Sequence, residues 1–243
     1  MKLKKISTLC LAASTIFAAS SAMAWESGDH STSASVALTT DYVWRGMTQT
    51  NYKEAIQGSF DYAHSSGLYA GVWASNVDFN APGTVEIDTY AGFGNEIGDT
   101  GIGYDVGFLR YIYPGTTTNA DWNEYHATAS YSFLSASVNY SSDVYNSGTT
   151  GLYYTLGAEY TLPQDFTVSA NVGWNHFNNP GAATSSASTK TGADYNIGVS
   201  KDFAGFGFDA RYYGTDKKLE RQAGIGTGKD ASDSFVFTIS KSM

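Results

Sequence analysis

Residues 166–177 read Phe-Thr-Val-Ser-Ala-Asn-Val-Gly-Trp-Asn-His-Phe, and apolar and polar side chains alternate along most of this stretch. The same pattern runs through residues 134–141, which read Leu-Ser-Ala-Ser-Val-Asn-Tyr-Ser, and through residues 151–161. Successive side chains of a β-strand point to opposite faces, so each stretch predicts a strand with one apolar and one polar face. Stretches of roughly ten residues match the length that a tilted strand needs to cross a bilayer.

Alternation of this kind predicts twelve strands along the chain. They span residues 32–44, 55–63, 68–77, 85–95, 101–113, 121–131, 134–142, 151–161, 166–177, 191–201, 205–214 and 232–243. An even number of strands brings both chain ends to the periplasmic side, as in single-chain bacterial barrels. The sequence therefore predicts an all-β fold, a transmembrane antiparallel up-and-down β-barrel of about twelve strands.

The lengths of the connections support this topology. Those after the even-numbered strands are short, as at residues 65–67 and 132–133, whereas most of the others are longer and include residues 178–190 and 215–231. Tight periplasmic turns and longer outer loops give this alternation. The two long loops are rich in Gly, Ser, Thr and Ala, which predicts mobile surface segments.

Aromatic residues lie near many of the predicted strand ends. They are Tyr42, Trp44, Tyr111, Tyr113, Trp122, Tyr131, Tyr140, Tyr160, Trp174 and Tyr212. Amphipathic rings favour the headgroup zone of a membrane, so we interpret these residues as girdles. The alternative is a soluble β-sandwich or lipocalin-like barrel, whose aromatic residues fill a core, because alternation does not say which face is inside.

Residues 1–24 have the pattern of a secretory signal peptide. Three lysines precede an apolar run at residues 6–19, and small residues lead to a cleavage site after Ala24. Cleavage leaves residues 25–243 as the barrel and takes the net charge from −9 to −12, because the three lysines are removed. The single cysteine, Cys10, lies in the removed segment, so no disulfide, thiolate metal site or Cys nucleophile is expected in the mature chain.

Composition also limits the partners. The acidity argues against nucleic acid and against an anionic membrane surface. After the signal peptide no stretch approaches twenty apolar residues, so any membrane crossing has to use strands. The expected partners are outer-membrane lipid and lipopolysaccharide, small polar solutes and the barrel-assembly machinery, and the sequence leaves the oligomeric state open. No metal or other cofactor is expected, because no His pair at ligand spacing and no ordered acidic loop occurs.

The segment Asp41-Tyr42-Val43-Trp44-Arg45-Gly46 resembles the opening motif Y-x-(W/F)-R-G of the TorF family of porin-like proteins. Further blocks that resemble this family are residues 66–77, 86–92, 104–107, 111–114 and 123–125. The resemblance covers residues 36–140, and the rest of the chain matches only as a generic barrel. It implies an outer-membrane, porin-like barrel and names no substrate.

In a transmembrane barrel the polar face of each strand lines the lumen. Alternation assigns nine acidic residues, two arginines and one histidine to this face. They are Asp41, Arg45, Asp61, Glu86, Asp88, Asp105, Glu124, His126, Glu159, Asp194, Asp209 and Arg211. An acidic lumen favours cations and neutral solutes over anions. Two interpretations stay open, an open channel or a narrow barrel plugged by these groups.

Arg45 and Asp41 are expected on one face of the first strand, where they would form a constriction with Glu86 and Asp88. The alternative is an ion pair in the lumen that fixes the first loop. Arg110 falls on the outward face, where either a bulge reorients it or it meets lipopolysaccharide phosphate. Four tyrosines with inward parity would offer stacking surfaces to sugars. They are Tyr69, Tyr90, Tyr153 and Tyr213.

The expected function is that of an outer-membrane porin-like channel for passive diffusion of small polar solutes, cation-preferring or neutral. A non-conducting barrel that displays surface loops is the alternative. A lipid-acting enzyme is a weaker one, because it needs a Ser, a His and an Asn or Asp on the outer wall, and His126 has inward parity. No catalytic residue is therefore assigned.

Overall fold

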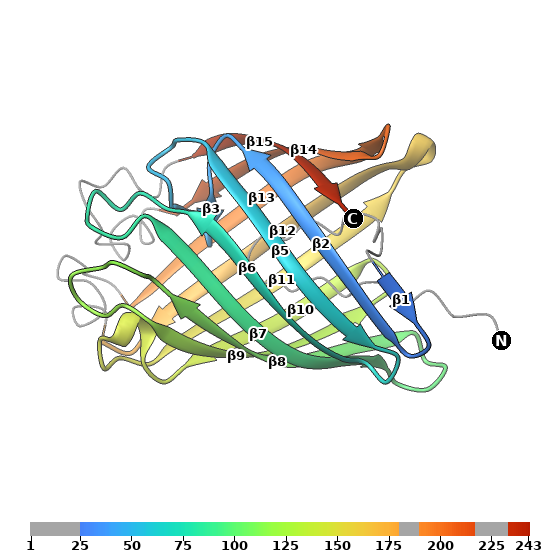
Figure 1. The fold of residues 1–243 in the computed structure, drawn as a ribbon, viewed down its shortest axis with the longest axis horizontal. Coiled ribbons are helices and arrows are strands. Elements are labelled where there is room, and N and C mark those ends of the chain that lie inside the picture. The colour runs from blue at the N-terminus through green and yellow to red at the C-terminus, as the bar shows by residue number, and fades with distance from the viewer. Residues whose placement is uncertain (1–24, 180–189, 217–232) are drawn as a thin grey trace.

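The computed structural model describes residues 25–179, 190–216 and 233–243. Its main element is a closed barrel of twelve antiparallel strands, which confirms the predicted fold class (Figure 1). The strands are β1 (Trp25–Ser27), β2 (His30–Thr39), β3 (Val43–Trp44), β4 (Met47–Thr48), β5 (Ala55–His64), β6 (Leu68–Asn76), β7 (Val85–Glu96), β8 (Ile102–Ile112), β9 (Trp122–Tyr131), β10 (Leu134–Ser141), β11 (Gly151–Thr161), β12 (Phe166–Phe177), β13 (Thr191–Phe203), β14 (Phe206–Thr215) and β15 (Ser234–Ser242). Two short 3-10 helices, η1 (Val144–Asn146) and η2 (Pro163–Asp165), lie in connections. Within the described ranges no helix is long and apolar enough to cross a membrane.

Strand β2 closes the barrel. One of its edges pairs with β5 over its whole length, from His30 opposite His64 to Thr39 opposite Ala55. The other edge pairs with β15 only between residues 35 and 39, and β1 folds back to pair with residues 30–32. Strand β1 thus continues the edge that β15 leaves uncovered, which removes an exposed row of backbone donors and acceptors.

The apolar faces of the strands point out of the barrel. Leu38, Ile56 and Phe60 are 60%, 58% and 54% exposed, whereas the inward Glu86 and Asn139 are each 1% exposed. A soluble barrel has the opposite arrangement, because its apolar residues fill the interior. The structure therefore excludes the lipocalin-like alternative and gives a wall suited to contact with lipid.

Replacing Phe60 by Arg is expected to lower the free energy of unfolding by about 2–4 kcal/mol, the cost of a basic residue near the middle of a lipid-facing strand. Phe60 occupies the middle of β5 and faces outward. Guanidinium unfolding of the protein in phospholipid vesicles measures the effect, with Phe60→Leu as the control. Unchanged stability of Phe60→Arg would contradict a lipid-facing position.

Several of the aromatic residues interpreted as girdles lie inside the barrel instead. Tyr131, Tyr140, Tyr160 and Trp174 are exposed on the outer wall. Five others lie within the barrel, where they are buried or pack against buried rings. They are Tyr42, Trp44, Tyr111, Tyr113 and Trp122. The girdle interpretation was wrong for these five because it considered only nearness to a strand end and not the face of the strand.

The predicted first strand at residues 32–44 was wrong at its end. Strand β2 stops at Thr39, and residues 40–54, called here the L1 hairpin, turn into the barrel. The short strands β3 and β4 are joined by Arg45 and Gly46, whose φ angles are 47° and 76°. Two successive residues with positive φ form the tight hairpin turn that Gly favours. The short connection between the strands predicted at residues 191–201 and 205–214 lies at residues 204–205, between β13 and β14.

Strand β1 and the C-terminus lie at the end of the barrel with the short turns, and the longer connections lie at the opposite end (Figure 1). We call these the turn end and the loop end. Most of the two long loops predicted at residues 178–190 and 215–231 lies outside the described residues.

Candidate functional site

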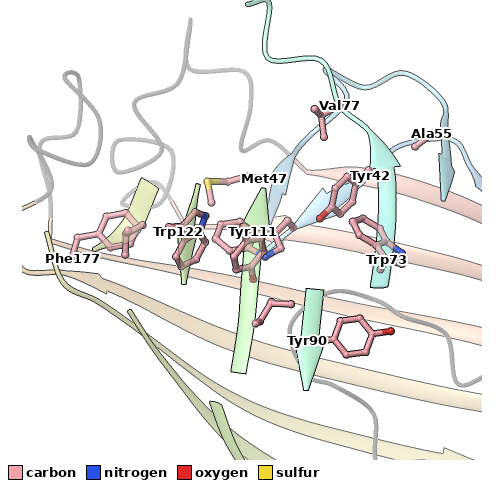
Figure 2. Packing of buried hydrophobic residues seen from close by; sticks show 12 residues of the cluster. Tyr42, Met47, Ala55, Trp73, Val77, Tyr90, Tyr111, Trp122 and Phe177 are labelled. Atoms are coloured by element: carbon pink, nitrogen blue, oxygen red, sulfur yellow. The ribbon is translucent and has the colours of Figure 1, made fainter. Parts of the chain in front are cut away.

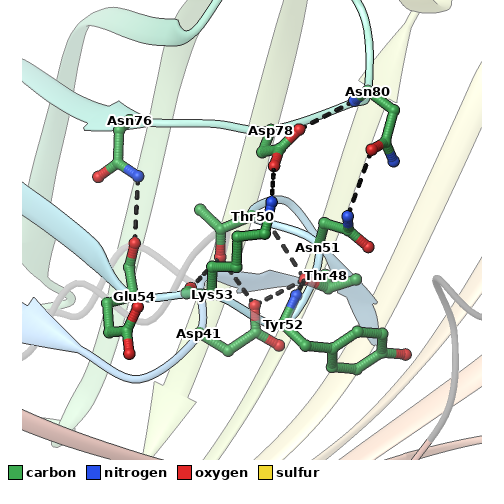
Figure 3. Close-up of polar contacts among 10 residues, drawn as sticks. All are labelled: Asp41, Thr48, Thr50, Asn51, Tyr52, Lys53, Glu54, Asn76, Asp78 and Asn80. Atoms are coloured by element: carbon green, nitrogen blue, oxygen red, sulfur yellow. Dashed lines mark hydrogen bonds and ion pairs between the residues drawn. The ribbon is translucent and has the colours of Figure 1, made fainter.

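The L1 hairpin is fixed inside the loop end of the barrel by a buried carboxylate. Thr48 and Thr50 donate hydrogen bonds of 2.6 and 2.9 Å from their hydroxyl groups to Asp41 Oδ1 (Figure 3). The Thr50 hydroxyl also accepts a hydrogen bond of 3.1 Å from the backbone N–H of Tyr42. Burial raises the pKa of Asp41 to about 6, although the two hydroxyl donors lower it. Asp41 is therefore ionised at pH 7 and anchors both arms of the hairpin.

A second set of contacts ties the hairpin to the next loop, residues 77–84. Lys53 pairs with Asp78 at 2.6 Å, and the side chain of Asn51 donates to Asn80 at 3.4 Å (Figure 3). The backbone N–H of Asp78 donates to the carbonyl of Gln49 at 2.8 Å. The base of the hairpin is thus held at the surface while its tip lies in the lumen.

Arg45, at the tip, reaches the opposite wall. One terminal nitrogen, Nη2, lies 2.7 Å from each carboxylate oxygen of Glu124 on β9. Its guanidinium carbon lies 4.4 Å from the ring centre of Trp44 and 4.2 Å from that of Tyr153 on β11. The side chains of Arg45 and Glu124 are only 6% and 3% exposed. Charge-assisted and cation–π contacts are strong when desolvated, so Arg45 docks the hairpin across the lumen.

Aromatic rings surround this ion pair and narrow the lumen at the loop end. We call Tyr42, Trp44, Trp73, Tyr111, Trp122, Tyr145 and Phe177 the aromatic collar. Tyr111 and Trp122 stack with their centres 4.2 Å apart and their planes 5° apart (Figure 2). Trp44 meets both rings edge-on at 6.1 Å, and Tyr42 meets Trp73 edge-on at 5.3 Å. The collar therefore packs the hairpin against β6, β8 and β9.

Two acidic residues in the collar have no basic partner. Glu86 and Asp88 occupy successive inward positions of β7 and are 1% and 4% exposed. Tyr42 donates a hydrogen bond of 3.3 Å to Glu86 Oε1, but Glu86 Oε2 and Asp88 Oδ1 have no hydrogen-bond partner within the described ranges. Arg45, which was expected near them, pairs with Glu124. Two neighbouring carboxyl groups with no basic partner among the described residues thus lie beside the aromatic collar.

The lumen towards the turn end carries separate polar clusters. His126 Nε2 lies 2.5 Å from Asp105 Oδ1, to which Tyr69 also donates at 3.0 Å. Tyr90 donates to Asp61. These clusters hold five of the residues predicted to face inward, and the wall between the clusters carries small side chains. Half-buried inward residues of this part include Ser33, Ser35, Ser59, Gly71, Ser135, Ser169 and Ser200.

Arg211 forms a third cluster on the wall of the lumen. Its guanidinium donates to Asn196 at 2.7 Å, to Ser169 at 2.8 Å and to Asp209 at 3.0 Å. It lies against Gly198, where a Cβ atom would come within 2.7 Å of the guanidinium carbon. The glycine therefore allows the side chain to lie flat along the wall and keeps it out of the passage.

The remaining predicted lumen residues differ in their surroundings. Asp194 is buried and accepts hydrogen bonds of 3.0 and 3.2 Å from the Tyr153 hydroxyl. Glu159 has inward parity but is exposed, because it lies near the turn end of β11. Tyr213 is buried against Val43 and Val236. Among the described residues, no group of three or more His, Cys, Asp or Glu side chains is placed to hold a metal ion.

The alternation of inward and outward side chains along a strand could have identified Tyr111 and Trp122 as lumen residues, although nearness to strand ends led to their interpretation as girdle residues. Trp122 shares its parity with Glu124 and His126, and Tyr111 shares its parity with Asp105, so both rings had to face the lumen. Trp44 gave no such signal, because the chain leaves the strand before it. Arg110 faces outward without a bulge, in register with Asn123, and pairs with Asp121 at 3.3 Å.

Solved structures share this fold. The NanC porin matches with a TM-score of 0.54 and 11% sequence identity, over 85% of this chain and 97% of the porin. The KdgM porin matches with a TM-score of 0.51 and 9% identity, over 86% of this chain and 97% of the porin. A weaker similarity, with a TM-score of 0.42 and 8% identity, is to LpxR from Salmonella typhimurium. Identities this low show the fold alone, that of a twelve-stranded porin-like barrel.

Comparison with known protein families gives a match that covers more of the chain than the segment 36–140, which resembles the TorF family. No curated protein matches the sequence significantly. A family profile described as "Bacterial protein of unknown function (Gcw_chp)" matches residues 23–243. Membership of the TorF family stays a prediction that rests on residues 36–140, whereas the Gcw_chp profile matches nearly the whole chain. The chain belongs to the Gcw_chp family of bacterial proteins of unknown function.

Proposed function

We propose that this protein is an outer-membrane channel through which small polar solutes diffuse passively, with cations and neutral solutes preferred to anions. The observation that carries the proposal is the distribution of polarity, an apolar outer wall around an acidic lumen. Of the nine predicted lumen acids, eight lie within the barrel, together with two arginines. Charge of one sign along a low-dielectric lumen raises the local concentration of counter-ions and sets selectivity.

The purified protein in planar bilayers tests this proposal. Discrete conductance steps are expected, with reversal potentials in a potassium chloride gradient that favour potassium. The signal peptide at residues 1–24, which lies outside the described residues, is part of the same proposal, because it would direct the chain to the cell envelope. A bilayer that stays silent at every salt concentration would exclude the channel.

One observation favours a second candidate, a barrel that conducts nothing and serves as a surface-exposed scaffold. The L1 hairpin and the aromatic collar fill the loop end, and Arg45 bridges the lumen to Glu124. Side chains that fill a small barrel leave no passage for water. The same bilayer recordings separate the two functions, since only a channel gives steps.

Replacing Glu86 by Gln and Asp88 by Asn in one variant should reduce the preference for potassium over chloride. Both carboxyl groups lie at the loop end of the lumen with no basic partner among the described residues, so the charge that they carry when ionised acts directly on a passing ion. The control is Asp165→Asn, at an exposed position in a turn-end connection. Equal reversal potentials for the double variant and the original protein would show that these acids do not face the ion path.

A further inference from the structure

At the loop end of the barrel, strands β9 and β10 separate. Their last paired residues are Tyr125 and Tyr140. Strand β9 nevertheless continues to Trp122, which pairs with Tyr111 of β8, and β10 continues to Ser141, which pairs with β11. The wall of the barrel is therefore open between β9 and β10 for a short stretch, although β9 stays paired with β8 and β10 stays paired with β11.

A hollow of about 190 Å³ lies in this split. Its lining comes from residues 110, 119 and 121–123 on one side and from residues 141–143 and 146 on the other. All nine lining side chains carry a polar group, and the indole N–H of Trp122, which is 3% exposed, has no hydrogen-bond partner among the described residues. A cavity of about 150 Å³ is large enough to bind a six-membered ring such as benzene, so this hollow has room for one ring of that size.

Several amide and hydroxyl groups that line the hollow make fewer hydrogen bonds to the described residues than they are able to make. Asn123 accepts from Arg110 at 3.0 Å through its oxygen, which leaves its two amide donors free among the described residues. Asn146 uses its amide nitrogen to donate to the Asn119 carbonyl at 3.0 Å, which leaves its side-chain oxygen free. Ser142 is exposed and uses its hydroxyl in no hydrogen bond. Donors and acceptors are thus interleaved, as recognition of adjacent hydroxyl groups requires.

The charges of the hollow argue against an anionic ligand. Arg110 is already paired with Asp121 at 3.3 Å, and Asp143 lies in the hollow with no basic partner. Acidic groups outnumber basic ones, so phosphate and carboxylate ligands meet net repulsion. A neutral ligand with many hydroxyl groups satisfies both the hydrogen-bonding pattern and the charge.

We propose that the hollow between β9 and β10 binds a single neutral sugar ring at the loop end of the barrel. The Asn123 amide N–H groups donate to its hydroxyl oxygens, while the side-chain oxygens of Asn146 and Asp143 accept from its hydroxyl groups. The site opens on the wall and needs only the folded barrel, so it does not depend on whether the lumen conducts. The ring comes either from a free sugar or from a membrane glycolipid, since both present the same hydroxyl chemistry.

Saturation-transfer NMR on the folded protein in a zwitterionic detergent tests the site, because sugar-headed detergents would compete. Glucose is expected to receive saturation, and glucuronate to receive clearly less. Ser142→Phe should weaken glucose binding about tenfold, the equivalent of one or two hydrogen bonds, because the ring fills the hollow without removing a contact. Ala81→Phe, at an exposed position of the loop 77–84 outside the hollow, is the matched control and should bind glucose as the original protein does.

Lipopolysaccharide added to the same sample separates the two sources. Loss of the glucose signal on addition assigns the site to a glycolipid ring, and an unchanged signal assigns it to free sugar. Glucose that receives no saturation, or that binds Ser142→Phe as well as the original protein, would overturn the proposal. Conductance recordings are independent of these outcomes, so a silent channel and an absent sugar site are distinguishable.

Discussion

Replacing residues 42–49 by an alternating Gly-Ser sequence of equal length should raise the single-channel conductance severalfold. These residues form the inner part of the L1 hairpin and contribute Tyr42, Trp44 and Arg45 to the narrow loop end of the lumen. Conductance of a water-filled passage is limited by its narrowest part, so removing the bulky side chains opens that part. Asp41 and Thr50 are kept, and with them the base of the loop.

Planar-bilayer recordings in concentrated potassium chloride measure this effect. The matched control replaces residues 80–83, in the neighbouring loop, by Gly and Ser, which leaves the hairpin and the collar in place. The control should conduct as the original protein does. If the hairpin variant folds into vesicles but keeps the original conductance, the L1 hairpin is not the narrowest part of the path.

Arg45→Ala should destabilise the docked hairpin by about 3–5 kcal/mol, the usual cost of removing one partner of a buried ion pair. The Glu124 carboxylate would be left 3% exposed and without its guanidinium, and the contacts of that group with Trp44 and Tyr153 would be lost. Amide hydrogen exchange at residues 42–50 reports the opening of the hairpin directly, because the barrel strands themselves stay paired.

Two further variants show whether the charge or the planar group of Arg45 holds the hairpin in place. Arg45→Lys keeps the positive charge but loses the planar group that contacts two rings, so intermediate protection is expected. Arg45→Ala combined with Glu124→Gln removes the stranded charge and should recover part of the loss, as a double-mutant cycle measures. Equal protection of residues 42–50 in Arg45→Ala and in the original protein would show that other contacts, such as those of Asp41, hold the hairpin alone.

The fold was predictable because it depends on a local property. Eleven of the twelve barrel strands were predicted within a few residues of their bounds, since alternation repeats in every strand and is read without knowledge of its neighbours. The first strand failed at its loop end. Tyr42 and Trp44 continue the alternation of β2 in sequence, but the chain turns inward at Thr40 and the tight turn at Arg45 and Gly46 redirects it.

The candidate site was predictable only in part. Parity predicted an inward direction for Glu86, Asp88 and Glu124, and the structure buries all three. It could not predict the partner of Arg45, because Glu124 lies 79 residues away along the chain and four strands, β5 to β8, separate β9 from β2 around the barrel. The same limit applies to the hollow at Ser142, which exists only because two strands stop pairing at Tyr125 and Tyr140.

The sequence by itself determined a barrel of about twelve strands with a polar face and an apolar face on each, because side-chain direction in a strand follows from position alone. Tertiary structure decided which face is inside, since the apolar face could have filled a soluble core as well as faced lipid. It also decided that the L1 hairpin enters the lumen, through an ion pair and ring contacts between Arg45, Glu124 and Tyr153. Contacts between distant residues depend on the closure of the barrel, which no local pattern encodes.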